Sequence, residues 1–97
     1  MDNMFYVYIV ASRRNGTIYT GMTDDLSRRI WQHKTKALGG FTAKHGCNRL
    51  VWYETQMTRD AAFRRERQIK EWRRSWRLLL IEDRNPTWAD LYETLNG

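Results

Sequence analysis

The hydrophobic pattern begins with two short runs of β-branched and aromatic residues, at 5–10 and 17–20. Asn15 and Gly16 lie between them. An Asn-Gly pair between two such runs is the strongest short signal for a β-hairpin. The N-terminal part of the chain therefore predicts two antiparallel strands joined by a tight loop.

The register of this hairpin decides which side chains share a face. A two-residue loop and a four-residue loop give the same parity, whereas a three-residue loop breaks it. Because side chains alternate along a strand, even parity gathers four residues on one face of the sheet. These are Tyr6, Tyr8, Tyr19 and Gly21.

The next pattern predicts a helix over about 25–36, whose apolar stripe contains Leu26 and Ile30. On a helical wheel, Arg29 and His33 flank this stripe, so we expect both over the tyrosine face of the hairpin. The helix can be capped by either of the two acids before it, Asp24 and Asp25.

The remainder of the chain predicts one more strand and mostly helices. A Gly-containing loop, which includes His45 as an expected surface residue, leads to the strand, and Ser75 breaks or kinks the helical region. Pro86 suits the first position of a final helix. The expected elements are a loop at 37–48, a strand at 49–55, and helices at 58–74, 76–82 and 86–95.

The fold class that follows is α/β in the broad sense (α+β), with a small three-stranded, mostly antiparallel sheet flanked by helices. With 97 residues we expect a single domain, with a core over about 4–83 and a short C-terminal helix over about 86–95. The single cysteine excludes an intrachain disulfide, and no apolar run has the length of a membrane span. We expect a cytoplasmic protein, monomeric by default.

Charge is distributed unevenly along the chain, whose formal net charge is +6. Residues 24–49 carry six Lys and Arg against two acids, and residues 58–77 carry eight against three. Residues 78–97 reverse the sign, with one Arg against four acids. A polyanionic partner is therefore expected to meet the middle of the chain, although a solvated basic surface is the plainer interpretation.

Glu66 is the one acid predicted at the margin of the core in the 58–74 helix. The stripe expected to be buried consists of Ala62, Ile69, Trp72 and Trp76, and Glu66 falls beside Ala62. A carboxylate at such a position needs a cation or a metal. A salt bridge with Lys70 is the alternative to a metal role.

Tyr19-Thr20-Gly21, followed by Leu26-x-x-Arg29 and then His33, resembles the core motif of the GIY-YIG nuclease family. The resemblance spans about Met4 to Trp88 and is closest to the family's small stand-alone branch. The first signature triplet, Tyr6-Val7-Tyr8, lacks the family's glycine, which puts the local strand geometry in doubt.

The resemblance implies a divalent-metal-dependent endonuclease that hydrolyses phosphodiester bonds in DNA. Either of the two tyrosines would be the base, Arg29 would hold the phosphate, and His33 would hydrogen-bond a tyrosine or the phosphate. Glu66 would bind one divalent ion, Mg²⁺ or Mn²⁺. The implied catalytic set is Tyr8, Tyr19, Arg29, His33 and Glu66, with Tyr6, Gly21 and Asn85 as supporting residues, Asn85 near the metal.

Basic and polar side chains outside that set are candidates for contacts with nucleic acid, made through phosphates rather than bases. They are Arg28, Lys34, Thr42, Lys44, Arg65 and Arg73, with Arg64, Arg67 and Arg74 as further phosphate contacts. Low sequence specificity is expected, and single-stranded or structure-selective DNA fits this pattern. Three aromatic residues are candidates for stacking on unpaired bases: Trp31, Phe41 and Trp52.

Two other functions fit the same sequence. One is a catalytically silent nucleic-acid-binding module that uses the basic surface. The other is a subunit of a larger nuclease complex that docks through its acidic C-terminal segment. The five implied catalytic residues argue against the silent module, since binding alone requires neither a tyrosine pair nor a half-buried glutamate.

Overall fold

The central strand of the sheet is β1 (Phe5–Ala11), which pairs antiparallel with both of its neighbours. The strand order is β2-β1-β3. The computed structural model describes residues 4–95. The other elements are β2 (Ile18–Thr23), α1 (Leu26–Lys34), α2 (Gly40–His45), β3 (Arg49–Gln56), α3 (Arg59–Glu71), α4 (Arg74–Arg84) and the 3-10 helix η1 (Leu91–Thr94). The predicted three-stranded antiparallel sheet with flanking helices is confirmed.

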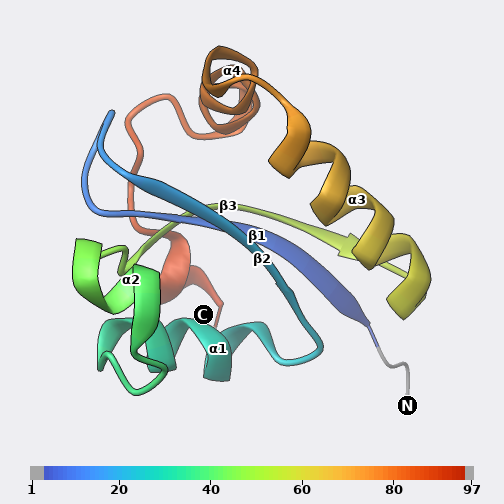
Figure 1. Cartoon of the computed structure of the whole chain (residues 1–97), viewed down its shortest axis with the longest axis horizontal. Helices are drawn as coiled ribbons and strands as arrows, with labels where there is room; N and C mark the ends of the chain where they lie inside the picture. Colours follow the sequence, from blue (N-terminus) through green and yellow to red (C-terminus); the bar gives the residue numbers. More distant parts are fainter. Residues whose placement is uncertain (1–3, 96–97) are drawn as a thin grey trace.

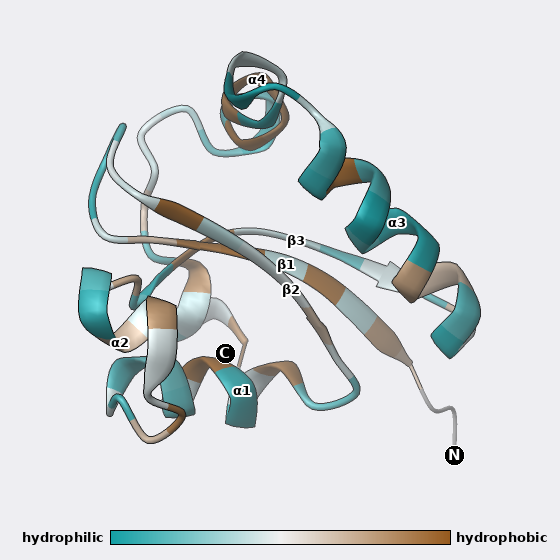
Figure 2. Ribbon diagram, viewed as in Figure 1, coloured by the Kyte–Doolittle hydropathy of each residue, from teal (hydrophilic) through white to brown (hydrophobic). Residues whose placement is uncertain are grey.

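The helices form a layer on each face of this sheet (Figure 1), with α3 and α4 on one face and α1 and α2 on the other. The alternation of side chains along β1 explains the two cores. Val7 and Ile9 pack toward α3 and α4, whereas Tyr8 and Val10 pack toward α1. Figure 2 shows α3 as a mostly hydrophilic helix with few hydrophobic residues, which agrees with its basic sequence.

The hairpin loop has four residues, 13–16, which is one of the two loop lengths that give even parity. Ser12 N–H donates to the Thr17 carbonyl at 2.9 Å, and Gly16 N–H donates to the Arg13 carbonyl at 2.9 Å. Tyr8 consequently lies opposite Gly21. The predicted shared tyrosine face is confirmed.

Helix α2 lies within the segment predicted to be a loop. Its glycines mark the boundaries of a short helix: Gly39 precedes it with φ of 64°, and Gly46 ends it in the left-handed conformation with φ of 65°. A glycine in this conformation is the common C-terminal cap of a helix. The glycines therefore mark breaks, as predicted, but the residues between them form a helix and not a loop.

The break in the helical region was predicted at Ser75 but lies earlier. The backbone is extended at Trp72 and Arg73, where α3 ends and α4 begins. This change of direction lets Ile69 and Ile81 both enter the same core. It also leaves Trp76, predicted in the buried stripe, 51% exposed.

The predicted helix over 86–95 is wrong except for its last turn, η1. The Asn85 side chain accepts from Ala89 N–H at 3.0 Å and donates to the carbonyls of Val51 and Ala89, which closes a turn instead. Trp88 has a positive φ of 57°, a conformation that a right-handed helix excludes. No helix within residues 4–95 is long and apolar enough to cross a membrane.

Gly21 lies directly under the phenol ring of Tyr8. A Cβ atom at this position would lie 2.5 Å from the Tyr8 Oη and 2.6 Å from its Cζ. Both atoms belong to a fully buried side chain with little room to move. Glycine at this position is therefore required by contact with the ring.

We expect Gly21→Ala to reduce the free energy of unfolding by about 1–3 kcal/mol, the usual cost of overpacking a core. Urea denaturation measures this directly. In a Tyr8→Leu background, which removes the ring, the same substitution should cost much less. An equal cost in both backgrounds would show that the ring contact is not the cause.

Candidate active site

A buried chain of hydrogen bonds joins β1, α1 and α2 beneath the tyrosine face. The Tyr8 hydroxyl lies 2.9 Å from His33 Nε2, and His33 Nδ1 lies 3.0 Å from Thr42 Oγ1. Helix α1 places His33 over β1 because Leu26 and Ile30, on the same stripe, are buried in that core. Both ring nitrogens of His33 are therefore occupied by protein groups.

Burial determines the protonation states of His33 and Tyr8 in this chain of hydrogen bonds. It lowers the pKa of His33 from its ordinary 6.5 to about 4, and the nearby Arg29 guanidinium lowers it further. Burial also raises the pKa of Tyr8 to about 12, which hydrogen bonding from Arg29 only partly offsets. At neutral pH the imidazole and the phenol are therefore both uncharged, and the hydrogen bond between them joins two neutral groups.

Arg29 lies on the exposed side of the same helix stripe, half-buried, and supplies the positive charge beside Tyr8. Its guanidinium also approaches the Met22 carbonyl at 3.5 Å. Arg28, its neighbour, is exposed. The two arginines line one hollow of about 220 Å³ at the start of α1, together with Asp25, which caps the helix by accepting from Arg28 N–H at 3.2 Å.

Tyr19 and Glu66 complete the set from β2 and α3. The Lys70 Nζ lies 5.3 Å from the centre of the Tyr19 ring and 3.6 Å from Glu66 Oε2. Glu66 is near enough to Tyr8 to raise its pKa, and its side chain is 15% exposed. The structure thus brings together all five residues predicted to be catalytic, and it also contains the Lys70 salt bridge weighed as the alternative for Glu66.

The donor set suits a hard divalent ion only in part. Within residues 4–95 no group of three or more His, Cys, Asp or Glu side chains could hold a metal. Mg²⁺ is often held by one or two carboxylates, with water and substrate phosphate oxygens filling the remaining positions. A single half-buried carboxylate, Glu66, fits that pattern, whereas it does not fit a structural zinc site.

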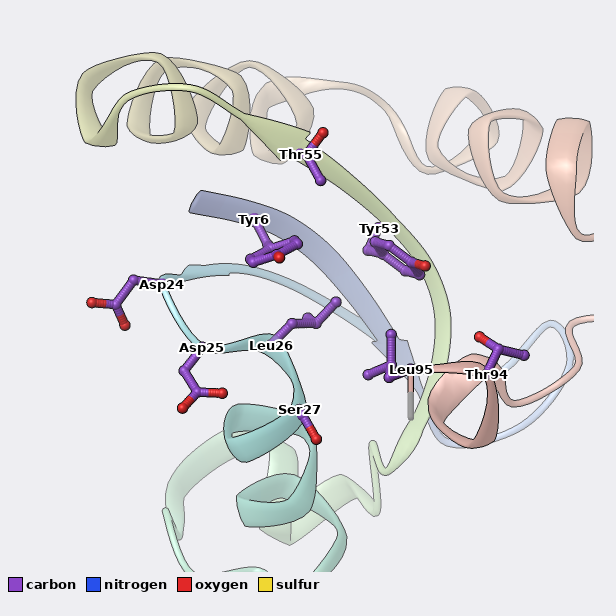
Figure 3. Close-up of a pocket in the computed structure, with 9 residues that line it drawn as sticks. All are labelled: Tyr6, Asp24, Asp25, Leu26, Ser27, Tyr53, Thr55, Thr94 and Leu95. Carbon is purple, nitrogen blue, oxygen red and sulfur yellow. The ribbon is translucent and has the colours of Figure 1, made fainter. Parts of the chain in front are cut away.

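Tyr6, expected to support the catalytic residues, contacts a different group. Its ring packs edge-to-face against Tyr53, with 6.5 Å between the ring centres. Figure 3 shows both rings with Leu26 and Leu95. These residues line a hollow of about 440 Å³. Tyr6 therefore lines a hollow beside Tyr53, and within residues 4–95 no hydrogen bond or ring contact joins its side chain to the other candidate catalytic residues.

Asn85, expected near the metal, is a structural residue. It is buried against β3, the strand at the opposite edge of the sheet from β2, and its amide groups bind backbone atoms. Its hydrogen-bonding groups are used to hold the turn after α4. The structure gives no support for a role of Asn85 beside Glu66.

Three of the six predicted nucleic-acid contacts are engaged within the protein. Burial alone would raise the pKa of the Asp90 carboxyl group, but pairing with Lys34 and hydrogen bonds from the backbone amides of Tyr92 and Leu50 outweigh it and lower that pKa. Arg65 binds Glu54 at 2.9 Å. Thr42 is buried against His33. The other three are exposed: Arg28, Lys44 and Arg73.

Of the three aromatic residues expected to stack on bases, two are exposed and one is buried. Trp31 and Phe41 are 53% and 48% exposed, whereas Trp52 is 2% exposed and belongs to the core. Two residues of the site were not singled out from the sequence for the positions they hold. Thr42 was taken as a nucleic-acid contact rather than a partner of His33, and Lys70 as an alternative rather than a neighbour of Tyr19. Only the fold brings these pairs together.

Comparison with known proteins shows a consistent set of relatives. The family model described as the GIY-YIG catalytic domain matches residues 4–79. A UPF0213 protein from Haloquadratum walsbyi is 35% identical over 83 residues, which cover 86% of this chain and 92% of the relative. One from Staphylococcus epidermidis is 34% identical over 83 residues, covering 86% and 99%.

A solved structure agrees with these matches. The solution NMR structure of a UPF0213 protein from Bacillus halodurans has a TM-score of 0.56 and 29% sequence identity to this chain, and the match covers 90% of this chain and 92% of that one. The family and fold predicted from the sequence motif are confirmed, and the roles of individual residues stay predictions.

The lowered pKa of His33 makes a prediction for stability. Because its folded pKa of about 4 lies below the ordinary 6.5, the unfolded state binds more protons between these values. The free energy of unfolding should therefore fall as pH drops from about 6.5 toward 4, with a His33 contribution of about 3 kcal/mol.

Urea denaturation between pH 7 and 4.5 measures this slope. His33→Gln should flatten it, and His45→Gln, which removes the exposed histidine of α2, should leave it unchanged. An NMR titration of His33 with a midpoint near 6.5 would contradict the neutral, buried imidazole.

Proposed function

The chain belongs to the GIY-YIG family, and from this premise we propose that it is a divalent-metal-dependent endonuclease that hydrolyses phosphodiester bonds in DNA with low sequence specificity. The observation that carries the proposal is the convergence of five side chains from four elements. Tyr8, Tyr19, Arg29, His33 and Glu66 come from β1, β2, α1 and α3 and meet beside one edge of the sheet.

Tyr19 is the tyrosine we assign to remove the proton from the attacking water. It is half-buried, whereas Tyr8 is fully buried, so Tyr19 is the phenol that a substrate can reach. The Lys70 ammonium group lies 5.3 Å from the centre of its ring, so a positive charge stands beside the place where the reacting phosphate would lie. General-base catalysis of this kind contributes about 10²–10⁴-fold to a rate.

Tyr8 acts in this proposal through Arg29. The Tyr8 hydroxyl shares a hydrogen bond with His33 on its buried side, and Arg29 is near enough to lower the pKa of the phenol. Holding Arg29 in this way directs its positive charge toward the phosphate, where charge develops during hydrolysis. The neutral His33 and Thr42 fix the Tyr8 hydroxyl from behind.

Glu66 would hold the metal ion, and when bound such an ion stabilises negative charge on the leaving oxygen. The Lys70 ammonium at 3.6 Å balances the Glu66 carboxylate in the protein alone. This pair is also the observation that favours the silent module, because an acid paired with lysine needs no further cation. The two functions differ in what removal of the Glu66 charge does.

Phosphate contacts would come from the exposed basic residues beside the site. Arg28 adjoins Arg29 in one hollow, and Lys44 is exposed on α2. Contacts of this kind position DNA without reading its sequence, which is the reason for proposing low specificity.

The first prediction of this function concerns Glu66→Gln. With Mg²⁺ or Mn²⁺ it should lose about 10²-fold or more of the cleavage of labelled single-stranded, duplex and flapped DNA, while retaining binding. Glu71→Gln is the matched control, because Glu71 is an exposed acid at the end of the same helix. Equal cleavage by both variants would contradict the assigned role, and binding without cleavage by the wild type would establish the silent module.

The second prediction compares an exposed arginine, Arg28, with Arg65, which pairs with an acid of the protein. Arg28→Ala should weaken DNA binding for every sequence and reduce the slope of log affinity against log salt by about 1. Arg65→Ala, which removes the partner of Glu54, should lower thermal stability and leave that slope nearly unchanged. Fluorescence anisotropy at several salt concentrations gives the slopes; an equal loss of slope in both variants would show that Arg65 also contacts phosphates.

A further inference from the structure

Two exposed phenylalanines flank the candidate catalytic group, one on each side. Phe41 on α2 is 48% exposed, and Phe63 on α3 is 47% exposed. A large apolar ring at the surface costs free energy in water, and a pair beside a candidate active site suggests that something covers them.

On the first side, the aromatic contacts lead from α2 to the catalytic group. The centre of the Phe41 ring lies 6.2 Å from that of Tyr19 and 4.4 Å from that of His45. Tyr19 in turn lies 6.1 Å from the His33 ring. Phe41 thus forms the outer end of an aromatic group whose inner members belong to the site.

On the second side, helix geometry places Phe63 next to Glu66. Phe63, Glu66 and Lys70 are spaced i, i+3 and i+7 along α3, so they lie on one stripe of the helix. The guanidinium carbon of Arg67 lies 5.5 Å from the centre of the Phe63 ring. Lys70 connects this stripe to Tyr19 through its contact with that ring.

The result is a row across the site, in which contacts join the first five members and helical spacing places the last two beside them: His45, Phe41, Tyr19, Lys70, Glu66, Phe63 and Arg67. Aromatic rings and basic groups both occur along it, with Glu66 as its one acid. This combination is the one with which proteins bind unpaired nucleic acid, since bases stack on the rings and phosphates meet the cations. In a duplex the faces of the bases are stacked on one another and cannot reach such rings.

We infer that the preferred substrate is an unpaired strand of DNA, whose bases on the two sides of the cleaved phosphate stack on Phe41 and Phe63. The inference rests on the proposed function for the position of that phosphate, between Arg29 and Glu66. It assigns a stacking role to Phe41, adds Phe63 as a binding residue, and gives the path of the DNA strand across the protein, from α2 over β2 to α3.

The experiment compares binding of single-stranded and duplex DNA of the same sequence, in a Glu66→Gln background that prevents cleavage. Phe41→Ala and Phe63→Ala should each weaken binding to the single strand by about 5- to 100-fold, the range expected for losing one stacked base. Binding to the duplex should change by less than about twofold. Leu79→Ala is the matched control, because Leu79 is a 66% exposed apolar residue on α4.

An oligonucleotide with abasic sites in place of the bases provides the second arm. This oligonucleotide keeps the phosphates but lacks the bases that would stack, so it should bind the parent protein more weakly than the normal strand. The phenylalanine substitutions should not weaken its binding further. Equal losses on normal and abasic strands, or no loss relative to Leu79→Ala, would overturn the inference.

The outcomes also separate this inference from the nuclease proposal. If wild-type protein cleaves no DNA and the two variants still lose single-strand binding, the row is a binding surface and the nuclease proposal fails. If wild-type protein cleaves DNA and the variants bind every strand normally, the nuclease proposal stands and the row is not part of it.

Discussion

The contact between the Tyr8 phenol and Gly21 determines how the rest of the site is arranged. Tyr8 is on the central strand and fully buried, and its ring crosses the neighbouring strand at the one position that has no side chain. This crossing carries the hydroxyl group to 2.9 Å from His33 Nε2, and near Arg29 and Glu66. A larger residue in place of Gly21 would displace the atom that these partners share.

The electrostatics of the site follow from that burial. Desolvation keeps His33 and Tyr8 uncharged at neutral pH, so the charges at the site belong to residues nearer its surface. These are Arg29, Lys70 and Glu66, two cations and one acid. A neutral, hydrogen-bonded interior therefore supports a charged surface, and the charged groups are the ones able to meet a phosphate and a metal ion.

Much of this site could be predicted from the sequence because its residues obey local periodicities. Hairpin parity placed Tyr8 on the same face of the sheet as Gly21, and the helical wheel placed Arg29 and His33 over that face. The contacts that were not predicted join different segments of the chain, and neither strand nor helix periodicity relates such segments to one another. Thr42 reaches His33 from a short helix bounded by glycines, and Lys34 meets Asp90 from 56 residues away. The turn at Asn85 depended likewise on a tertiary bond to β3.

Local packing also explains why the first signature triplet can have Tyr6 in place of the family's glycine. The sequence put the strand geometry around Tyr6 in doubt, yet β1 keeps a regular register there, with Tyr6 opposite Thr23 on one side and Thr55 on the other. The Tyr6 side chain has room because it lines the open hollow of Figure 3. At Gly21 the equivalent space is filled by the Tyr8 ring. The two glycine positions thus differ in what faces them, so a side chain is accommodated at the first and excluded at the second.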